Sequence, residues 1–536
     1  MIKFNKVICA IGIVLGLCGC SDWDDHYNGT NSSEGNNNTL WQQLKSEQRL
    51  SDFCEVLEQT KIFRQHKKTP VSYAELLNGG QSFTVVAPVN GTFDKDSLLQ
   101  LVQTAQGDSI VEKFFVLNHI SRKLVSIPAK KDRMLLLNSK HVEIGMDDIE
   151  GVRITNKNIY AKNGVLHIAE KPLPYERSLF EMLCDNPDFS TIGSFIRKYD
   201  EDYFDSDNSV SSGIIEGVPV YVDSVIIERN RFLDRIGYIN AEDSMYWVIA
   251  PTTAGWKKAY EETAKYFVYD KKVAKRDSIQ QYWAHRALID DAVFNMTDQY
   301  SVNDSLTSVQ YVRGSAINNK PVYHVFQKPF ADGGILSKAT PVDASNGVLY
   351  KVDEWPFTPE QTFFRPIWSE VENTYYLTES KLCSYNSRRI AADSISEGAY
   401  LQIVPEKATS NWEMTFRVNN TLSGHYDICA IVLPRTITHK DQTFKPCKFK
   451  ATVNYVDTLG ASKTYNCKNT QFKSDPARVD TVVLAESFYL PACNYDNTEL
   501  KVSVKLTCSI LARENSSYSR EMYLDCIYLR PKKVNN

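Results

Sequence analysis

The sequence predicts two related α+β domains followed by an all-β domain. An apolar strand that ends in Ala-Pro, followed by a polar turn and an aromatic residue, occurs at 81–93 (QSFTVVAPVNGTF) and again at 245–256 (MYWVIAPTTAGW). From about residue 358 onward, helical periodicity gives way to alternating apolar and polar residues, which is typical of half-buried antiparallel strands. At roughly 150 residues per domain, a chain of 536 residues has room for three or four domains.

The composition is that of an ordinary globular protein, with 43% hydrophobic and 24% charged residues, so most of the chain can bury a core. The formal net charge is −4, and lysine and arginine are scattered rather than gathered in a stripe. We therefore expect no nucleic-acid partner.

The first 19 residues have the organisation of a signal peptide. Lys3 and Lys6 precede an apolar stretch, residues 7–17, that is too short to cross a bilayer as a helix. The stretch ends in Leu-Cys-Gly-Cys, which resembles the lipobox of bacterial lipoproteins; a plain secretory signal is the alternative. We expect residues 1–19 to be removed and the thiol of Cys20 to carry a lipid anchor.

Residues 20–38 are predicted to form a tether. The run Ser-Asp-Trp-Asp-Asp after Cys20 resembles the acidic export signal that sends lipoproteins of Bacteroidota to the outer face of the outer membrane, although acidic runs are also common in solvated tails. The Asn-rich stretch 28–38 is polar and of low complexity. We expect a protein anchored in the outer membrane and facing the cell exterior.

Cysteine usage adds no site. Nine cysteines remain after the signal peptide and Cys20, and an odd number cannot all pair within the chain. Several lie on the apolar phase of predicted strands, which favours buried thiols, while export leaves disulfides open as the alternative.

Further landmarks repeat in one order. Leucines at helical spacing open each copy, a helical histidine follows, and each copy closes on Asn-Gly-Val-Leu. The separation grows from 139 residues between Leu40 and Leu179 to 183 between the closing asparagines, so the second copy carries insertions, at 199–244 and 296–343. The fold-marking residues are Ala87, Pro88, Phe93, Asn163 and Gly164 in the first copy and Ala250, Pro251, Trp256, Asn346 and Gly347 in the second.

These landmarks together resemble the fasciclin domain. The segments NGVLHIAEKPLP and NGVLYKVDEWPF are similar to its closing conserved box. The resemblance implies α+β domains at 39–177 and 178–357, each with helices packed on a small β-sandwich wedge. A shape kept in both copies also favours a scaffold role for the Ala-Pro strand, in which proline ends the strand and the aromatic residue fills the core beneath the turn.

Residues 358–536 predict a β-sandwich or jelly roll. Alternation is clearest at 412–418, 426–432, 447–455 and 500–508. The segments SGHYDICAIVLP and REMYLDCIYLRP resemble strands of the galactose-binding-like jelly rolls found in carbohydrate-binding modules. In some of those modules a carboxylate on the final strand helps to hold a structural calcium, and the resemblance would place that ligand at Asp525; otherwise we expect no metal and no cofactor.

The sequence carries no short catalytic motif, neither GxSxG, HExxH, a P-loop, a GxGxxG after a strand nor a CxxC pair. Glycosidase carboxylates follow no short spacing rule. The expectation that the protein is not an enzyme therefore rests mainly on the fasciclin resemblance.

Two groups of polar residues were weighed as sites. His119 and His285 occupy matching positions on amphipathic helices; the fasciclin resemblance links that region to adhesion, whereas repetition favours packing or hydrogen bonding. The carboxylates of 200–202, with Asp205 and Asp207, could attract a cation, but the spacing lacks the glycine of an EF-hand loop, which favours a solvated loop.

Aromatic residues crowd the junction between the second and third predicted domains. Such rings can stack on sugars as a glycan platform, but domains joined without a linker also bury an interdomain core, which is the favoured interpretation. The residues are Trp355, Phe357, Phe363, Phe364, Trp368, Tyr375 and Tyr376.

Taken together, these features predict a non-catalytic surface lipoprotein, similar to accessory subunits of SusC/SusD-type TonB-dependent nutrient importers, that captures substrate or docks on the importer. The expected partners are the importer, other surface lipoproteins and an oligosaccharide or peptide ligand. The alternatives are a stand-alone glycan-binding protein that uses the β-sandwich, and a cell adhesion protein. A ligand is best sought in the second-copy insertions, the aromatic junction or the C-terminal sandwich.

Overall fold

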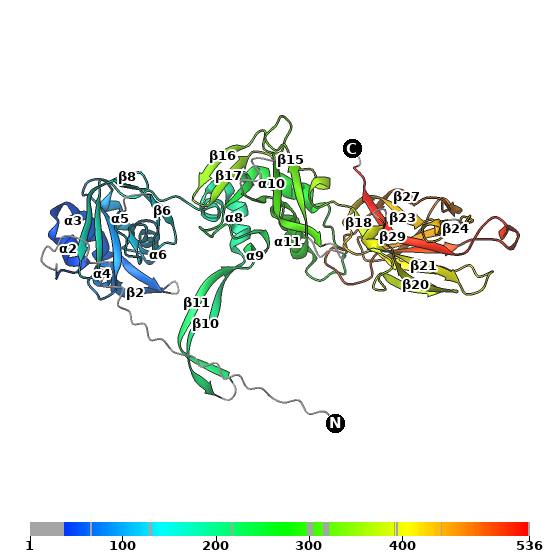
Figure 1. Ribbon diagram of the computed structural model, residues 1–536, viewed down its shortest axis with the longest axis horizontal. Helices are drawn as coiled ribbons and strands as arrows, with labels where there is room; N and C mark the ends of the chain where they lie inside the picture. The colour runs from blue at the N-terminus through cyan, green and yellow to red at the C-terminus, as the bar shows by residue number, and fades with distance from the viewer. Residues whose placement is uncertain are drawn as a thin grey trace, which may run out of the picture. The chain divides into compact units, whose positions relative to one another are not determined.

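The structure is a computed structural model that describes residues 37–64, 67–127, 131–215, 218–296, 304–314, 321–390, 392, 395–440 and 442–533; the side chains of 205–228 and 310–322 are outside this description. The signal peptide, Cys20 and most of the tether also lie outside it. The chain forms two compact units, Met1–Tyr175 and Glu176–Asn536 (Figure 1). None of the helices in the described ranges is both long enough and apolar enough to span a membrane.

The first unit packs short helices against a seven-stranded sheet. Strand β3 is buried along its whole length because its two faces enter different cores: Val85 and Ala87 pack with the helices, and Val86 packs with the outer strands of the sheet. This explains the unbroken apolar run of the first Ala-Pro strand. Helices α2 and α4 begin at capping boxes formed by Thr39 and Ser72.

The elements of this unit are the helices α2 (Leu40–Ser46), α3 (Ser51–Gln59), α4 (Tyr73–Leu77), α5 (Lys95–Leu101) and α6 (Ala105–Val111), a separate hairpin of β1 (Lys61–Arg64) and β2 (Lys67–Ser72), and a sheet in the order β4 (Ile120–Ser121), β3 (Phe83–Pro88), β9 (Gly164–Ala169), β8 (Val152–Ala161), β7 (Asp148–Ile149), β6 (His141–Ile144) and β5 (Asp132–Leu135).

Glu176–Asn536 opens with a second α+β domain that repeats this plan. Its helices are α7 (Leu179–Asp185), α8 (Ser190–Arg197), α9 (Leu233–Ile236), α10 (Thr253–Ala264) and α11 (Arg276–Ile289), and its sheet has the order β15 (Pro321–Gln327), β14 (Ser305–Gly314), β13 (Val293–Asn295), β12 (Tyr246–Pro251), β17 (Gly347–Val352) and β16 (Thr340–Ala344). The predicted insertions form two hairpins. One is the long ribbon of β10 (Asp200–Ile215) and β11 (Val218–Asn230), and the other is β14 with β15.

The two Ala-Pro strands hold equivalent positions in the two copies. Strand β3 runs parallel to β9 with Phe83 opposite Gly164, and β12 runs parallel to β17 with Tyr246 opposite Gly347. In each copy the proline is the last residue of its strand. The repeated sequence pattern is therefore one structural unit, a parallel pair formed by the Ala-Pro strand and the Asn-Gly-Val-Leu strand.

The asparagine before each closing strand ties that strand to the first helix of its copy. Asn163 Oδ1 accepts from the amide of Leu40 at 2.7 Å, and Asn346 Oδ1 accepts from the amide of Leu179 at 2.9 Å. The side-chain amide of each asparagine donates to backbone carbonyls of the segment that leads into the Ala-Pro strand. This is why the asparagine occurs in both copies.

The glycine that follows is required for close backbone approach. A Cβ on Gly164 would collide with the carbonyl oxygen of Phe83, and one on Gly347 with that of Tyr246. Both glycines also have positive φ, +156° and +145°, which side chains disfavour.

The C-terminal domain is a sandwich of two antiparallel sheets, which together with the α+β copies confirms the predicted fold class. One sheet has the order β20 (Cys383–Arg389), β21 (Ala399–Pro405), β29 (Met522–Pro531), β23 (Gly424–Leu433) and β27 (Asp480–Leu490), with β18 (Ile367–Glu370) also paired to β29; the other has the order β19 (Leu377–Lys381), β22 (Glu413–Arg417), β28 (Ser503–Cys508), β24 (Lys448–Val456) and β25 (Ser462–Asn466), with β26 (Phe472–Lys473) also paired to β24. The predicted strand at 500–508 was wrong at its start: β28 begins at Ser503, and Leu500, which precedes it, is 48% exposed.

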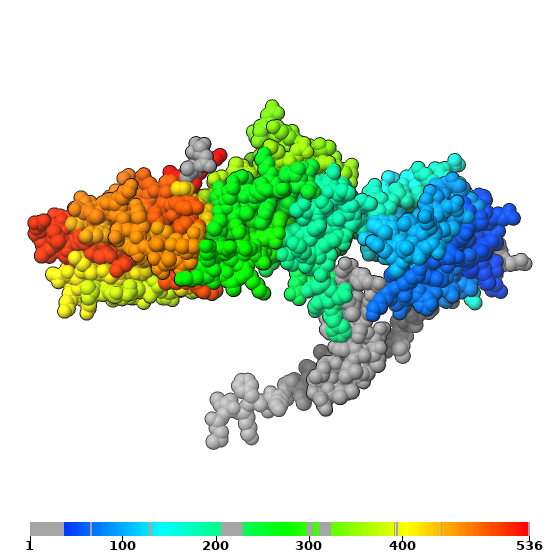
Figure 2. Space-filling view, turned by 180° about the vertical axis from the view of Figure 1, so that it is seen from behind, coloured from blue at the N-terminus to red at the C-terminus, as the bar shows by residue number. Residues whose placement is uncertain are grey.

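The second α+β domain and the sandwich share one hydrophobic core. Figure 2 shows the surfaces of these two parts in direct contact, green against orange and yellow. Phe267, Tyr269 and Ala284 of the α+β domain are buried in the same cluster as Trp412 and Phe416 of the sandwich. The amide of Cys493 also donates to the carbonyl of Val268 at 2.7 Å. The junction between these two parts is therefore a packed contact rather than a linker.

All nine described cysteines are free thiols, and seven of them are buried. Burial raises the pKa of Cys54 and Cys493 to about 12, so both remain protonated at neutral pH. They behave as small apolar core residues, as the sequence favoured.

Candidate ligand pocket between the second α+β domain and the β-sandwich

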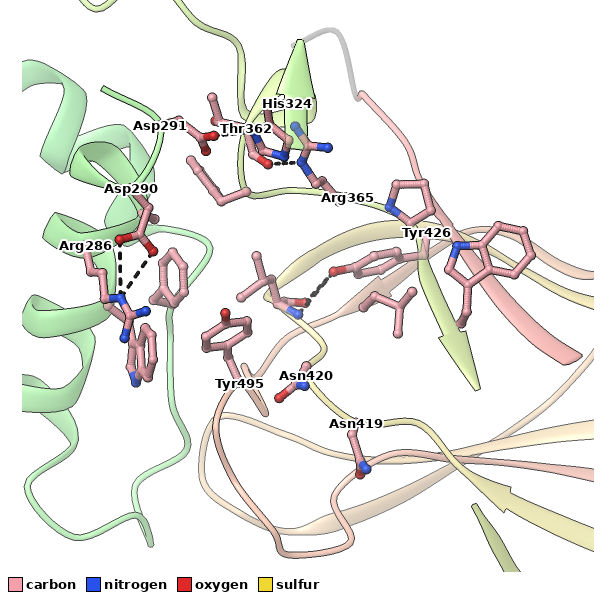
Figure 3. Close-up of a pocket in the computed structure, with 18 of the residues that line it drawn as sticks. Arg286, Asp290, Asp291, His324, Thr362, Arg365, Asn419, Asn420, Tyr426 and Tyr495 are labelled. Atoms are coloured by element: carbon pink, nitrogen blue, oxygen red, sulfur yellow. Dashed lines mark hydrogen bonds and ion pairs between the residues drawn. The ribbon is translucent and has the colours of Figure 1, made fainter. Parts of the chain in front are cut away.

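A pocket of about 610 Å³ lies where these two parts of Glu176–Asn536 meet. Three stretches line it: the end of α11 with part of β15, the segment 362–376 that joins the two parts, and loops of the sandwich near residues 420 and 495. Figure 3 shows polar side chains from these stretches converging on the same space. The pocket therefore brings together one second-copy insertion, the aromatic junction and the sandwich.

Aromatic rings form much of the apolar wall. Phe363, Trp368 and Tyr376 come from the junction segment, and Trp283 and Tyr495 come from the two flanking parts. The indole of Trp368 lies against the ring of Tyr528, with centroids 4.2 Å apart, so its orientation is fixed by packing. Rings held in this way can contact the apolar face of a sugar.

One side of the pocket carries a charge pair on the last turns of α11. The guanidinium of Arg286 lies 3.2 Å from the carboxylate of Asp290, and its carbon lies 4.7 Å from the centre of the Trp283 ring. Loss of solvent raises the pKa of Asp290 to about 7, against the opposing effect of Arg286. Near neutral pH the protonated and the ionised forms of this carboxyl group are therefore both populated, and it can donate a hydrogen bond in the first form and only accept in the second.

A second polar corner is built by Asp291, His324 and Arg365. Asp291 and His324 are both buried, and Asp291 bonds to Nδ1 of the imidazole. The guanidinium of Arg365 donates through Nε to the carbonyl of Thr362 and through a terminal nitrogen to the carbonyl of Gln361. Figure 3 shows His324, Thr362 and Arg365 together on this side of the pocket.

The sandwich supplies amide and hydroxyl groups on the opposite side (Figure 3). Asn419 Nδ2 donates to the hydroxyl of Tyr375 at 3.1 Å, and Asn420 Oδ1 accepts from the amide of Asp496 at 3.1 Å. The hydroxyl of Tyr426 bonds to the backbone of Leu422. Side chains of this kind fix the orientation of a polar ligand in a largely apolar pocket.

The seven candidate aromatic residues do not form one surface. Trp355 and Phe357 pack in a small core of the second α+β domain that also contains Phe294. Phe364 is buried in the shared core, and Tyr375 is 52% exposed outside the pocket lining. Only three of the seven line the pocket: Phe363, Trp368 and Tyr376.

The repeated histidines are core residues. His119 lies in a short turn after α6; its Nδ1 donates to the carbonyl of Phe115 at 2.7 Å, and its Nε2 accepts from the amide of Leu173 at 3.0 Å. Nδ1 of His285, in α11, accepts from the indole of Trp256 at 3.2 Å. Burial lowers the pKa of both imidazoles to about 4, so both are neutral at pH 7.

The aromatic residues that close the Ala-Pro turns both reach this histidine region. Trp256 is buried and stacks on His285, whereas Phe93 is half-buried and contacts Phe115, which in turn contacts His119. Trp256 lies in α10 rather than in a turn, because α10 begins two residues after Pro251. In the second copy the tryptophan thus contacts the histidine directly.

Asp525 lies in a cluster of carboxyl groups inside the sandwich. It neighbours Glu370 and Glu372, and its Oδ2 accepts from the amide of Ser396 at 3.2 Å. Desolvation, reinforced by the neighbouring carboxylates, raises the pKa of Asp525 and of Glu372 to about 7. Within the described part of the chain, no three carboxylate, histidine or cysteine side chains converge as the ligands of one metal ion.

The acidic run at the start of the insertion lies at the base of the β10–β11 ribbon. Asp200 accepts from the side chain of Asn230 at 2.7 Å, and Glu201 pairs with Arg231. The side chains of Asp205 and Asp207 fall outside the described residues. Asp200 and Glu201 therefore have protein partners.

The polar residues of the pocket were not singled out from the sequence. Arg286 directly follows a repeated histidine, and Asp290 and Asp291 follow the last residue of the same helix, so the available signal was an arginine with two carboxylates four and five residues later. Arg365 stands within an aromatic run. His324 carries no local motif, because the carboxylate that bonds to its ring lies 33 residues away in the sequence.

Comparison with known proteins identifies one family in part of the chain. The model of the fasciclin domain matches residues 49–174, so the chain contains a fasciclin domain in its first unit. No catalytic family is indicated. No curated protein matches the sequence.

Several solved structures share low similarity with the chain. A Clostridium thermocellum xylanase Xyn10B fragment with CBM22-1 and GH10 modules is 10% identical over 31% of this chain and 28% of its own, with a TM-score of 0.21. A FAS1 domain pair from the insect cell adhesion molecule fasciclin I is 11% identical over 52% of this chain and 90% of its own, with a TM-score of 0.19. The CBM22-1 xylan-binding domain of Paenibacillus barcinonensis Xyn10C is 13% identical over 32% of this chain and 95% of its own, with a TM-score of 0.20.

Proposed function

We propose that this protein is a non-catalytic surface lipoprotein that captures an oligosaccharide in the junction pocket, as an accessory subunit of a SusC/SusD-type TonB-dependent importer. The pocket carries the binding part of the proposal, because aromatic walls combined with amide, hydroxyl and carboxyl groups suit a polyhydroxylated ring. The lipobox at Cys20 and the acidic run after it support the surface location.

A binding role fits the pocket better than catalysis. Asp290 has a pKa near 7, as a general acid would, but it is paired with Arg286. Asp291 is paired with His324. Both carboxyl groups are thus occupied by protein partners, which favours holding a ligand over transferring a proton to it.

A substitution in the pocket wall tests the binding role directly. Replacing Trp368 by alanine removes a ring of the pocket wall, and we expect a loss of at least tenfold in affinity for any bound oligosaccharide, since stacking aromatic anchors contribute about 2 kcal/mol or more to binding. Titration calorimetry against neutral and acidic polysaccharide fragments measures this. Replacing Tyr385, which is exposed on the sandwich outside the pocket, by alanine is the matched control.

Two outcomes would contradict the proposal. If no fragment in the panel binds the intact chain, the pocket is not a saccharide site. If fragments bind equally well to the Trp368→Ala and Tyr385→Ala proteins, binding takes place elsewhere on the chain.

The importer partnership has its own test. Purification of the tagged protein from membranes in mild detergent is expected to recover a TonB-dependent importer with it. Recovery of the protein alone, with saccharide binding intact, would favour a stand-alone glycan-binding protein. Attachment to cells that is lost on deletion of residues 39–357 would instead favour adhesion.

A further inference from the structure

We infer that the corner formed by Asp291, His324 and Arg365 binds the carboxylate of an acidic sugar, so that the captured oligosaccharide contains uronic acid residues. This inference rests on the proposed function and names its ligand class. At this corner of the pocket, Nε2 of His324 has no hydrogen-bond partner among the described residues.

His324 presents one nitrogen without a partner. The residue is 8% exposed, and Asp291 fixes the ring through Nδ1. Nε2 is buried and makes no hydrogen bond within the described part of the chain. Buried polar atoms are usually satisfied, so a nitrogen left free in a pocket wall points to a bound group.

Arg365 presents a cation beside it. Its bonds to the carbonyls of Thr362 and Gln361 use one edge of the guanidinium and hold the planar group in place. Among the described residues, no carboxylate lies within 4.0 Å of its nitrogens, whereas Arg286 across the pocket is paired with Asp290. Burial lowers the pKa of Arg365, and the nearby charge of Asp291 opposes that effect without reversing it. No described carboxylate bonds to the guanidinium, so part of the cost of desolvating this cation remains.

A uronic acid meets both requirements. Its carboxylate can accept two parallel hydrogen bonds from the free edge of the guanidinium. Nε2 of His324 can accept from a ring hydroxyl when the imidazole is neutral and donate to the carboxylate when it is protonated. A neutral sugar would offer no carboxylate to the free edge of the Arg365 guanidinium.

The rest of the pocket is consistent with a ligand that is charged at one end only. Glu370, from the junction segment, and Glu397, from the sandwich, also line it. Glu370 accepts from the hydroxyl of Ser396 at 2.7 Å. These two carboxylates disfavour a second acidic group beside them, and the rings of Trp368 and Tyr376 remain available for the sugar rings.

The test compares trigalacturonate with its methyl ester, in which each carboxylate is neutralised, by titration calorimetry on the full chain. We expect the acid to bind at least tenfold more tightly than the ester. Arg365→Gln should abolish that difference, and Arg365→Lys should keep part of it, because a lysine retains the charge but not the bidentate geometry. Arg388→Gln, an exposed arginine of β20 that contacts Gln402, is the control.

Each other outcome overturns the inference. Equal affinity for acid and ester, unchanged by Arg365→Gln, would leave saccharide capture standing but remove the acidic specificity. A tri-glutamate peptide that binds as tightly as trigalacturonate would show carboxylate recognition without the sugar. If neither these probes nor neutral fragments bind, the proposed function itself fails.

Discussion

Replacing Asn346 by alanine is expected to lower the free energy of unfolding of the second α+β domain by about 3 kcal/mol. The side chain bonds to three backbone groups, the amide of Leu179 and the carbonyls of Ile239 and Ala241, at 2.8–2.9 Å. Alanine leaves all three without this partner in a buried site, and each unsatisfied group costs about 1–3 kcal/mol.

The same change in the first copy should act in the same way. Asn163 bonds to the amide of Leu40 and to the carbonyls of Leu77 and Gly79. At roughly 2–4 °C per kcal/mol for domains of this size, each variant should lose about 6–12 °C in Tm for its own unit. Scanning calorimetry with limited proteolysis identifies which unit has been destabilised.

Two further variants sharpen this test. Asn346→Asp keeps the acceptor for Leu179 but turns the two donors into charged acceptors facing carbonyls, so it should be at least as destabilising as alanine. Asn156→Ala removes an exposed asparagine that contacts Arg49, and it should change stability by less than about 0.5 kcal/mol. A Tm for Asn346→Ala within 2 °C of the unchanged protein would show that the repeated asparagine does not hold the helix to the closing strand.

The second large effect concerns pH. Asp525 and Glu372 each have a folded-state pKa of about 7, well above the value near 4 of an exposed carboxyl group. For a pKa raised on folding, the contribution to stability is complete below the unfolded value and is lost as the pH rises through the folded value. The sandwich should therefore lose stability between about pH 4 and pH 7, on the order of 2–4 kcal/mol in all.

Asp525→Asn is the matching variant, because asparagine keeps the shape of the side chain and cannot ionise. In EDTA, we expect the Tm of the unchanged protein to fall from pH 5 to pH 8 and that of Asp525→Asn to fall by clearly less. Asp480→Asn, at the start of the exposed edge strand β27, should follow the unchanged protein. A Tm that does not depend on pH in the unchanged protein, or a Tm at pH 8 that recovers in CaCl₂, would show that protons do not neutralise this cluster.

The sequence predicted the parts of this fold that depend on local pattern. The Ala-Pro strands, the closing Asn-Gly strands, the insertions and the change to alternating strands near residue 358 each leave a signal in neighbouring residues. The fasciclin resemblance added a prediction of how these elements pack together, and the family match covers the first copy. Local periodicity and repeats carry information about secondary structure and fold, because both are set mainly by neighbours in the chain.

The candidate site was less accessible to sequence reasoning. Aromatic crowding at 355–376 predicted a junction, but the periodicity there could not separate Trp368, in the pocket wall, from Phe357, in a separate core. The polar partners lie far apart in sequence: His324 meets Asp291 across 33 residues, and Tyr495 comes from a sandwich loop near the end of the chain. Only the fold brings such residues together, so no spacing rule could have identified them.

The β10–β11 ribbon has a consequence for backbone exchange with solvent. Its two strands pair only with each other, over 16 and 13 residues, and Figure 1 shows the ribbon extending away from the helices of its domain. Every second amide along each strand of such a ribbon points outward, without a neighbouring strand to accept its hydrogen. In deuterated water these outward amides should exchange within seconds, while the central amides of β12, between β13 and β17, retain their protons for far longer.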